Sequence, residues 1–248
     1  MKTIIIKKSL IILAVVGLAV GAPVQKTAKP WTEWSKKDVE KMLNDSAWGQ
    51  TQSEGESSEP SQTSAITQVA APRAANRELD REGESPEVKK VKLVKYRVRF
   101  LTAKPIREAF ARMVWLSQDK PSEELANQLQ GFIDRDFGDY IVVVIGVETT
   151  DQRIGEVLTK TFSTATAEAL QGKIYLERKD GKRASLIDYR PPTADGMGAK
   201  FIFQRKIDGQ PFLTETDNVR FVAMLNDKIK LNTRYKLSEM VYDGKLEY

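Results

Sequence analysis

One apolar run constrains this chain more than any other feature: residues 139–148, which read DYIVVVIGVE. A half-exposed strand alternates apolar and polar residues, whereas an unbroken run rich in β-branched residues is typical of a strand covered on both faces. We therefore predict a central strand here, with the flanking elements packed around it in one folded domain.

Helical patterns lie on both sides of this run. Pro105 opens a predicted helix over 104–117, because proline at the first helical position loses no hydrogen bond. A second helix is predicted after Pro121, with an apolar stripe that reaches Ile133, and a third over 151–162.

Strand patterns make up the rest of the predicted domain. Residues 91–101 alternate apolar and basic side chains after a slip at Leu93, which predicts a β-bulge or a strand start. After Gly172, Asp-Gly pairs typical of tight hairpins occur among strand-like stretches. These stretches are 174–178, 183–189, 200–206, 219–225 and 228–237. The expected fold class is α+β: a single domain over 88–248 with about three helices near a central apolar strand and an antiparallel C-terminal sheet.

The first residues have the pattern of a secretory signal peptide over 1–21. Lysines flank the start, a short apolar core follows, and Ala19-Val20-Gly21 supplies small residues at both positions that a signal peptidase reads. The alternative is an uncleaved membrane anchor, but the apolar core is short for a bilayer span. We expect a secreted or periplasmic protein without a transmembrane segment once the signal is removed.

Between the signal and the domain, the sequence predicts a short Trp-rich helical segment over 30–48 and a disordered linker over 49–87. Ser35 and Asp38 resemble a helix cap, and the linker has hardly any large apolar residue. The helix is too short to be stable alone, so it should dock either on its own domain or on another protein of the cell envelope. The candidate partner-binding residues are Trp31, Trp34, Met42, Leu43 and Trp48.

The composition excludes several kinds of active site. The chain has no cysteine and no histidine, so neither a histidine-based catalytic triad nor a histidine-ligated metal site can form. We expect no cofactor and no metal, and the enzyme class is not favoured. Carboxylates remain available for catalysis, but no spacing singles out a pair among Glu177, Asp188, Glu215 and Asp217.

Basic residues gather at two places. Lys95, Arg97 and Arg99 share one face of the first strand, and Arg178, Lys179, Lys182 and Arg183 surround a predicted hairpin tip. Each group is either a solvated polar surface or a candidate anion-binding surface. The net charge of +5 is too small to predict nucleic-acid binding.

Several stretches together resemble a known family. WSKKDVEKMLNDSAW, YRVRFLTAKPIREAFAR, FIFQR and the ending KLSEMVYDGKLEY are similar to an uncharacterised family of exported bacterial proteins, largely from soil bacteria. Some of its members are labelled GWxTD-domain proteins. The resemblance implies an exported protein of unestablished function and carries no catalytic or binding residues.

The sequence thus predicts an exported, non-catalytic protein with a binding or structural role in the cell envelope. Two alternatives stay open: a carboxylate-based hydrolase acting on glycans, and a binder of anionic polymer or lipid headgroups through a basic surface.

If the signal-peptide prediction is right, the mature chain begins near Ala22. N-terminal sequencing of protein recovered from the periplasm or the medium checks this. Recovery from membranes alone, with Met1 intact, would contradict it.

Overall fold

The computed structural model describes residues 29–56 and 92–248. The predicted signal peptide and most of the predicted linker lie outside these residues.

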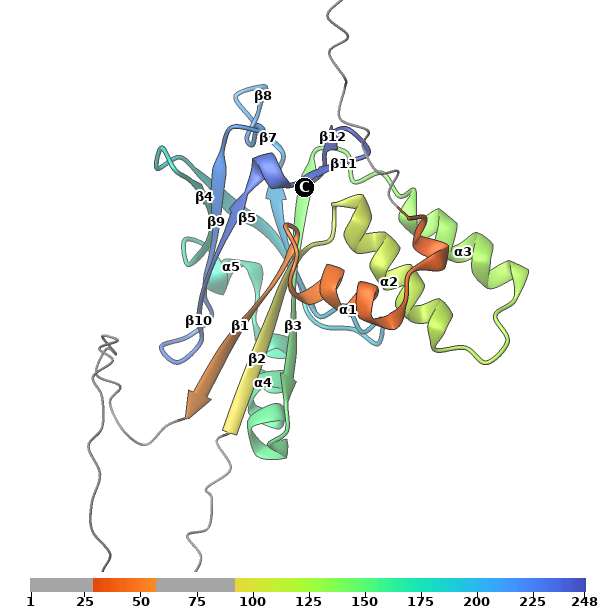
Figure 1. Cartoon of the computed structure of the whole chain (residues 1–248). Coiled ribbons are helices and arrows are strands. Elements are labelled where there is room, and N and C mark those ends of the chain that lie inside the picture. Colours follow the sequence, from red (N-terminus) through yellow and green to blue (C-terminus); the bar gives the residue numbers. More distant parts are fainter. Residues whose placement is uncertain (1–28, 57–91) are drawn as a thin grey trace, which may run out of the picture.

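The domain is organised around one antiparallel sheet of eight strands, in the order β1-β2-β3-β6-β5-β4-β9-β10. The strands are β1 (Gly49–Glu56), β2 (Lys92–Phe100), β3 (Tyr140–Thr149), β4 (Ile174–Arg178), β5 (Arg183–Arg190), β6 (Ala199–Gln204), β9 (Asn218–Met224) and β10 (Lys230–Lys236). The sheet curves until its first and last strands, β1 and β10, lie side by side (Figure 1). The result is nearly a closed barrel with helices on its outside, which confirms the mixed α+β class.

Glutamine side chains close the seam between β1 and β10. Gln52 donates to the carbonyl of Lys230 at 2.9 Å and accepts from the backbone N–H of Asn232 at 3.0 Å. Gln50 donates to the carbonyl of Arg234 at 2.5 Å. Strand edges carry unpaired backbone groups that invite association with other chains, and here side-chain amides satisfy part of that edge.

The predicted central strand is confirmed as β3, which pairs with β2 on one side and β6 on the other. Residues 141–145 are all buried. Ile141, Val143 and Ile145 alternate with Val142 and Val144 toward opposite faces, so this half of the strand is covered both inside and outside the barrel.

Aromatic side chains fill the barrel interior. The largest fully buried ones are Phe100, Phe201, Phe203, Phe221 and Tyr235. The rings of Phe100 and Tyr235 meet edge to face with centroids 4.8 Å apart. Tyr235 also donates to the carbonyl of Val98 at 3.0 Å, so this interior pair links β10 to β2 just inside the seam.

Helices cover part of the outer face. α1 (Lys36–Asn44), α2 (Lys104–Leu116) and α3 (Glu123–Ile133) gather on one side of the barrel, and α4 (Gln152–Thr164) lies beside β3 (Figure 1). The three helices predicted within the domain correspond to α2, α3 and α4, and the predicted helix of the Trp-rich segment is α1. Shorter elements complete the fold: η1 (Trp31–Glu33), α5 (Ala167–Leu170), β7 (Lys206–Ile207), β8 (Gln210–Pro211), η2 (Leu237–Glu239), β11 (Val241–Tyr242) and β12 (Lys245–Leu246).

The predicted boundaries of the linker and of the domain are wrong. Gly49–Glu56 is the edge strand β1, paired with β2 from Gly49 opposite Arg99 to Glu56 opposite Lys92. Its sequence, GQTQSEGE, lacks the apolar alternation of a strand because its stabilising contacts are backbone pairing and the glutamine seam. The domain therefore includes the tryptophan segment and β1, while the rest of the predicted linker lies outside the described residues.

Two smaller predictions concern register and turns. β2 begins at Lys92 and pairs without interruption, so the slip near Leu93 marks a strand start; the irregularity in the sheet lies in β5 between Leu186 and Asp188. Of the three Asp-Gly pairs, Asp208-Gly209 and Asp243-Gly244 have positive φ at both residues, as the preferred hairpin turn requires.

Replacing Gln52 with alanine should weaken the seam. The variant loses the two hydrogen bonds across the seam and a longer one to Glu54 at 3.3 Å. Since a hydrogen bond contributes about 0.5–1.5 kcal/mol, the two seam bonds alone should lower the free energy of unfolding by about 1–3 kcal/mol in urea denaturation. Gln128→Ala is the control, because Gln128 lies on the exposed face of α3 and its amide contacts only Glu124. A loss for Gln52→Ala no larger than for the control would show that the seam adds no stability.

Candidate functional site

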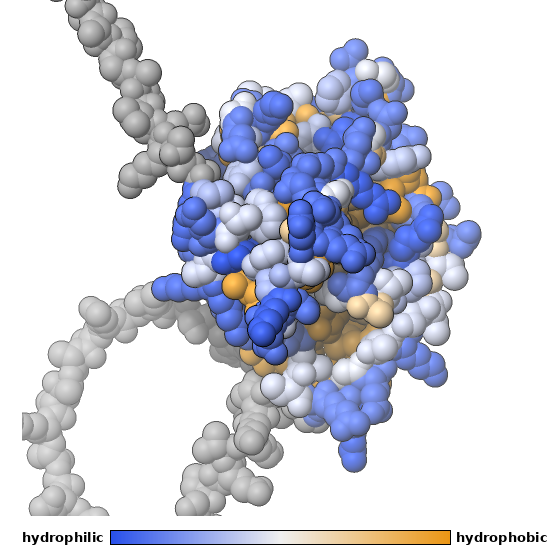
Figure 2. Space-filling view, turned by 90° about the vertical axis from the view of Figure 1, so that its right-hand side faces the viewer, coloured by the Kyte–Doolittle hydropathy of each residue, from blue (hydrophilic) through white to orange (hydrophobic). Residues whose placement is uncertain are grey.

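A groove of about 1090 Å³ lies on the outside of β2 and β3. It runs between α1 and α2 on one side and α4 on the other. Its apolar lining includes Val39, Phe110, Met113, Leu116, Leu158 and Phe162. On the side of the molecule that carries α1 to α3, recessed hydrophobic surface lies between hydrophilic protrusions (Figure 2).

Large apolar side chains in this groove face solvent. Met113 and Leu116 are 41% and 43% exposed, and both line the groove. α2 buries residues Pro105 to Ala111 against the domain, whereas Met113, Val114 and Leu116 near its C-terminal end are exposed. An apolar wall that the described residues leave uncovered is the feature expected of a binding site.

Arg99 lies at the floor of the groove and is only 5% exposed. Its Nε donates to the carbonyl of Leu43 at 2.7 Å, and its Nη2 donates to Oδ1 of Asn44 at 2.9 Å. These hydrogen bonds satisfy two acceptor oxygens at the C-terminal end of α1, where the helix dipole favours a positive charge. Burial, with a smaller effect of Arg97, lowers the pKa of Arg99 to about 10, so the guanidinium stays charged at neutral pH.

The predicted basic row on β2 is therefore not one exposed surface. α1 covers Arg99, and Arg97 forms an ion pair with Glu148 of the neighbouring strand. Lys95 is half-buried and does not line the groove. Burial under α1 could not be read from the alternation of residues 91–101, because the covering helix is distant in sequence.

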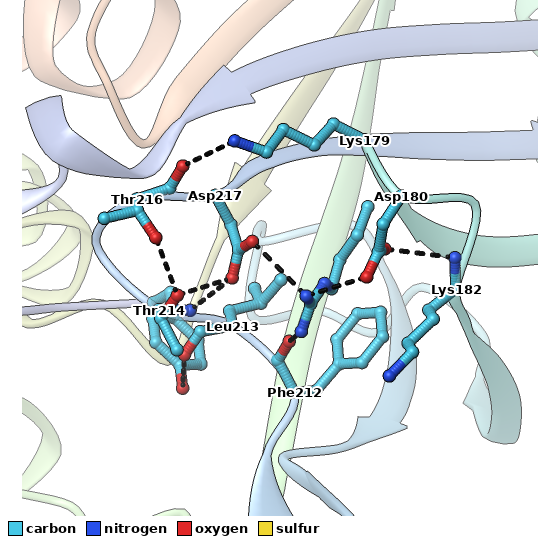
Figure 3. Close-up of polar contacts among 10 residues, drawn as sticks. Lys179, Asp180, Lys182, Phe212, Leu213, Thr214, Thr216 and Asp217 are labelled. Carbon is cyan, nitrogen blue, oxygen red and sulfur yellow. Dashed lines mark hydrogen bonds and ion pairs between the residues drawn. The ribbon is translucent and has the colours of Figure 1, made fainter.

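The second group of predicted anion-binding residues has nearby partners of its own. Arg178 pairs with Asp180 at 2.9 Å and with Asp217 at 3.5 Å. Lys179 donates to the carbonyl of Thr216 at 3.3 Å (Figure 3). Asp180 also accepts from the backbone N–H of Lys182 at 3.2 Å (Figure 3).

Arg183 completes this group by bonding Glu177 at 2.8 Å and lying over the ring of Tyr175 at 4.2 Å. The hairpin of β4 and β5 is separated from β2 by β3 and β6 in the sheet. The two predicted groups of cations thus do not form one basic face.

The tryptophan segment docks on its own domain. Trp34 and Trp48 are each 7% exposed, and Leu43 is 4% exposed. The indole of Trp48 donates to the carbonyl of Glu247 at 2.8 Å, and the carbonyl of Trp34 accepts from Arg112 at 2.8 Å. These three side chains are covered by the chain itself and offer no surface to a partner, whereas Trp31 and Met42 are half-buried.

The candidate carboxylates have partners outside the groove. Glu177 pairs with Arg183 and Arg220, and Asp188 with Arg190. Asp217 accepts from both the N–H and the hydroxyl of Thr214, at 2.8 and 2.7 Å (Figure 3). Glu215 lies exposed in a turn.

Glu108 is a buried carboxylate that the sequence did not indicate. Tyr242 donates to its Oε2 at 2.5 Å, and the ammonium of Lys104 lies 3.8 Å away. Burial raises the pKa of Glu108, against the lowering effect of the Tyr242 hydrogen bond. Glu108 does not line the groove, so it is poorly placed to act on a ligand there.

Comparisons with known proteins give the chain no relative. No family model, curated protein or solved structure matches it, so the resemblance to GWxTD-domain proteins stays a prediction. Over residues 29–56 and 92–248, no helix is both long and apolar enough to cross a bilayer. The same residues contain no group of three or more acidic side chains placed to hold a metal ion.

Stability should depend on pH through Glu108. Because its folded pKa is raised, the folded state keeps the proton longer than the unfolded state, so stability falls as pH rises from the unfolded pKa through the folded one. Glu108→Gln keeps an acceptor for Tyr242 but cannot ionise. Relative to the unchanged protein, this variant should gain unfolding free energy between about pH 4 and pH 7 in urea denaturation.

Glu215→Gln is the control for this measurement, since Glu215 is exposed. A Glu108→Gln difference that is the same at both pH values would contradict the assignment.

Proposed function

We propose that this chain is an exported, non-catalytic binding protein of the cell envelope whose ligand is a small, largely apolar molecule held in the groove. The observation that carries the proposal is the exposed apolar wall formed by Met113 and Leu116 of α2. The pattern of residues 1–21 supports the exported location.

Physical chemistry favours an apolar ligand at this wall. Fully burying a methionine, leucine or valine side chain is favourable by about 1.5–3 kcal/mol. Met113 and Leu116 therefore offer substantial binding free energy to a molecule that covers them. The volume of the groove also matches small-molecule sites, which occupy roughly 300–1,000 Å³.

The two alternatives have less support. A hydrolase needs two carboxylates that converge on a ligand; Glu40 and Glu148 line the groove, but Glu148 is already paired with Arg97. Glu108, the buried carboxylate, does not line the groove. A binder of anionic polymers needs a continuous basic face, and most of the predicted cations have acidic or carbonyl partners within the fold.

A neutral apolar fluorophore, N-phenyl-1-naphthylamine, tests the proposal directly. It should bind the full chain with increased fluorescence, and Met113→Asp or Leu116→Asp should lower its affinity about tenfold or more, because a carboxylate on the wall must be desolvated. Both positions are exposed, so the fold should tolerate the change.

Val157→Asp is the matched control. Val157 lies on α4, is 64% exposed and does not line the groove, so this variant should bind the fluorophore as the unchanged protein does. Equal loss of affinity in all three variants, or no binding by the unchanged protein, would overturn the proposal.

A further inference from the structure

Arg99 is a buried cation without an acidic partner among the described residues. Its guanidinium contacts the carbonyl of Leu43, the amide oxygen of Asn44 and the ring of Phe110, whose centroid lies 5.4 Å from the guanidinium carbon. The charge of Arg97, which has the same sign, lowers the pKa of Arg99 in addition to the effect of burial. A buried charge without a counter-ion is costly, and the oxygens at the end of α1 offset only part of that cost.

One nitrogen of this guanidinium remains available. Nε and Nη2 bond to α1, whereas Nη1 makes no hydrogen bond within the described part of the chain. If Nη1 were closed off from solvent, it would be a buried polar atom without a hydrogen-bond partner. Among the described residues, the atoms of this kind are Arg178 Nε and Thr233 Oγ1. Arg99 Nη1 is not one of them, and Arg99 lines the groove, so this donor reaches the groove.

Gly146 keeps this donor uncovered. It stands opposite Arg97 in the β2–β3 register and faces outward. A Cβ at this position would lie 3.3 Å from Arg99 Nη1, so any side chain there would crowd the free nitrogen. Glycine weakens a strand interior and often marks a place where a ligand approaches the backbone.

From these contacts we infer that the groove ligand is a straight-chain carboxylic acid, whose carboxylate accepts a hydrogen bond from Arg99 Nη1 while its chain covers the exposed side chains of Met113 and Leu116. This inference rests on the proposed function, because it names the ligand class of the same groove. The long apolar wall and the single buried donor are complementary to the two ends of such a molecule.

The other charges of the groove favour a monoanion. The charged residues that line the groove are Lys36, Glu40, Arg97, Arg99 and Glu148, three cations and two carboxylates, so the formal net charge of the groove is +1. A dianionic phosphate would exceed this charge and would also meet the carboxylates of Glu40 and Glu148. A carboxylate requires one charge-assisted hydrogen bond, which is among the stronger contacts available to a ligand.

Calorimetric titration of the full chain with dodecanoic acid and with 1-dodecanol, at about pH 8 where the acid is ionised, tests the inference. The acid should bind at least about tenfold more tightly than the alcohol, because a hydrogen bond to a charged group is lost with the alcohol. Shortening the acid by one methylene should lower affinity about fourfold, as expected for burial of the chain.

Gly146→Ala tests the free nitrogen of Arg99 without removing the hydrogen bonds of Arg99 to α1. Mutating Arg99 itself would also release the end of α1, whereas the added methyl group leaves those bonds in place and crowds only Nη1. The variant should bind the alcohol as before and lose most of its preference for the acid. The control is the double variant Arg97→Gln with Glu148→Gln, which removes a pair without changing the net charge and should keep the preference.

Each outcome separates the two proposals. Equal affinity for acid and alcohol would overturn the acid assignment and leave an apolar binding site standing. Binding of neither molecule would overturn the proposed function as well. An unchanged preference in Gly146→Ala, or its loss in the double variant, would show that Arg99 is not the residue that holds the carboxylate.

Discussion

The pairing of β1 with β2 is the contact on which the rest of the structure depends. β1 forms a complete antiparallel ladder with β2, and its glutamines reach β10 across the seam. This pairing draws Trp48 under Tyr242, with ring centroids 6.0 Å apart, and so fixes α1 against the outer face of β2. A strand without apolar alternation thereby closes the barrel and positions one wall of the groove.

Buried arginines join the helices to the barrel. Arg99 closes the C-terminal end of α1, and Arg107 does the same for α3 by donating to the carbonyl of Ile133 at 2.7 Å. The last carbonyls of a helix have no intrahelical partner, and a guanidinium supplies several donors in a fixed geometry. The two arginines meet the same need, but Arg99 alone also borders the groove and retains a free donor.

The groove exists because the helices cover the outer face of the sheet only in part. Residues 141–145 of β3 are enclosed, whereas beyond Gly146 the strand becomes partly exposed. α2 ends in an exposed apolar turn, and α4 lies on the far side of the opening. A fold optimised for stability alone would cover this surface, so its exposure is the feature that most favours a binding function.

The sequence by itself determined the elements that depend on local pattern: the β3 run, the helices opened by Pro105 and Pro121, and the Asp-Gly turns. Each follows from the periodicity or the backbone preference of neighbouring residues. Only the tertiary structure decided that Gly49–Glu56 is a strand, that Arg99 is buried, and that Met113 faces an open groove. The physical reason is distance along the chain. Gln52 bonds Lys230, and Arg99 bonds Leu43; because the partners of each pair are far apart in sequence, the pattern of neighbouring residues cannot predict them.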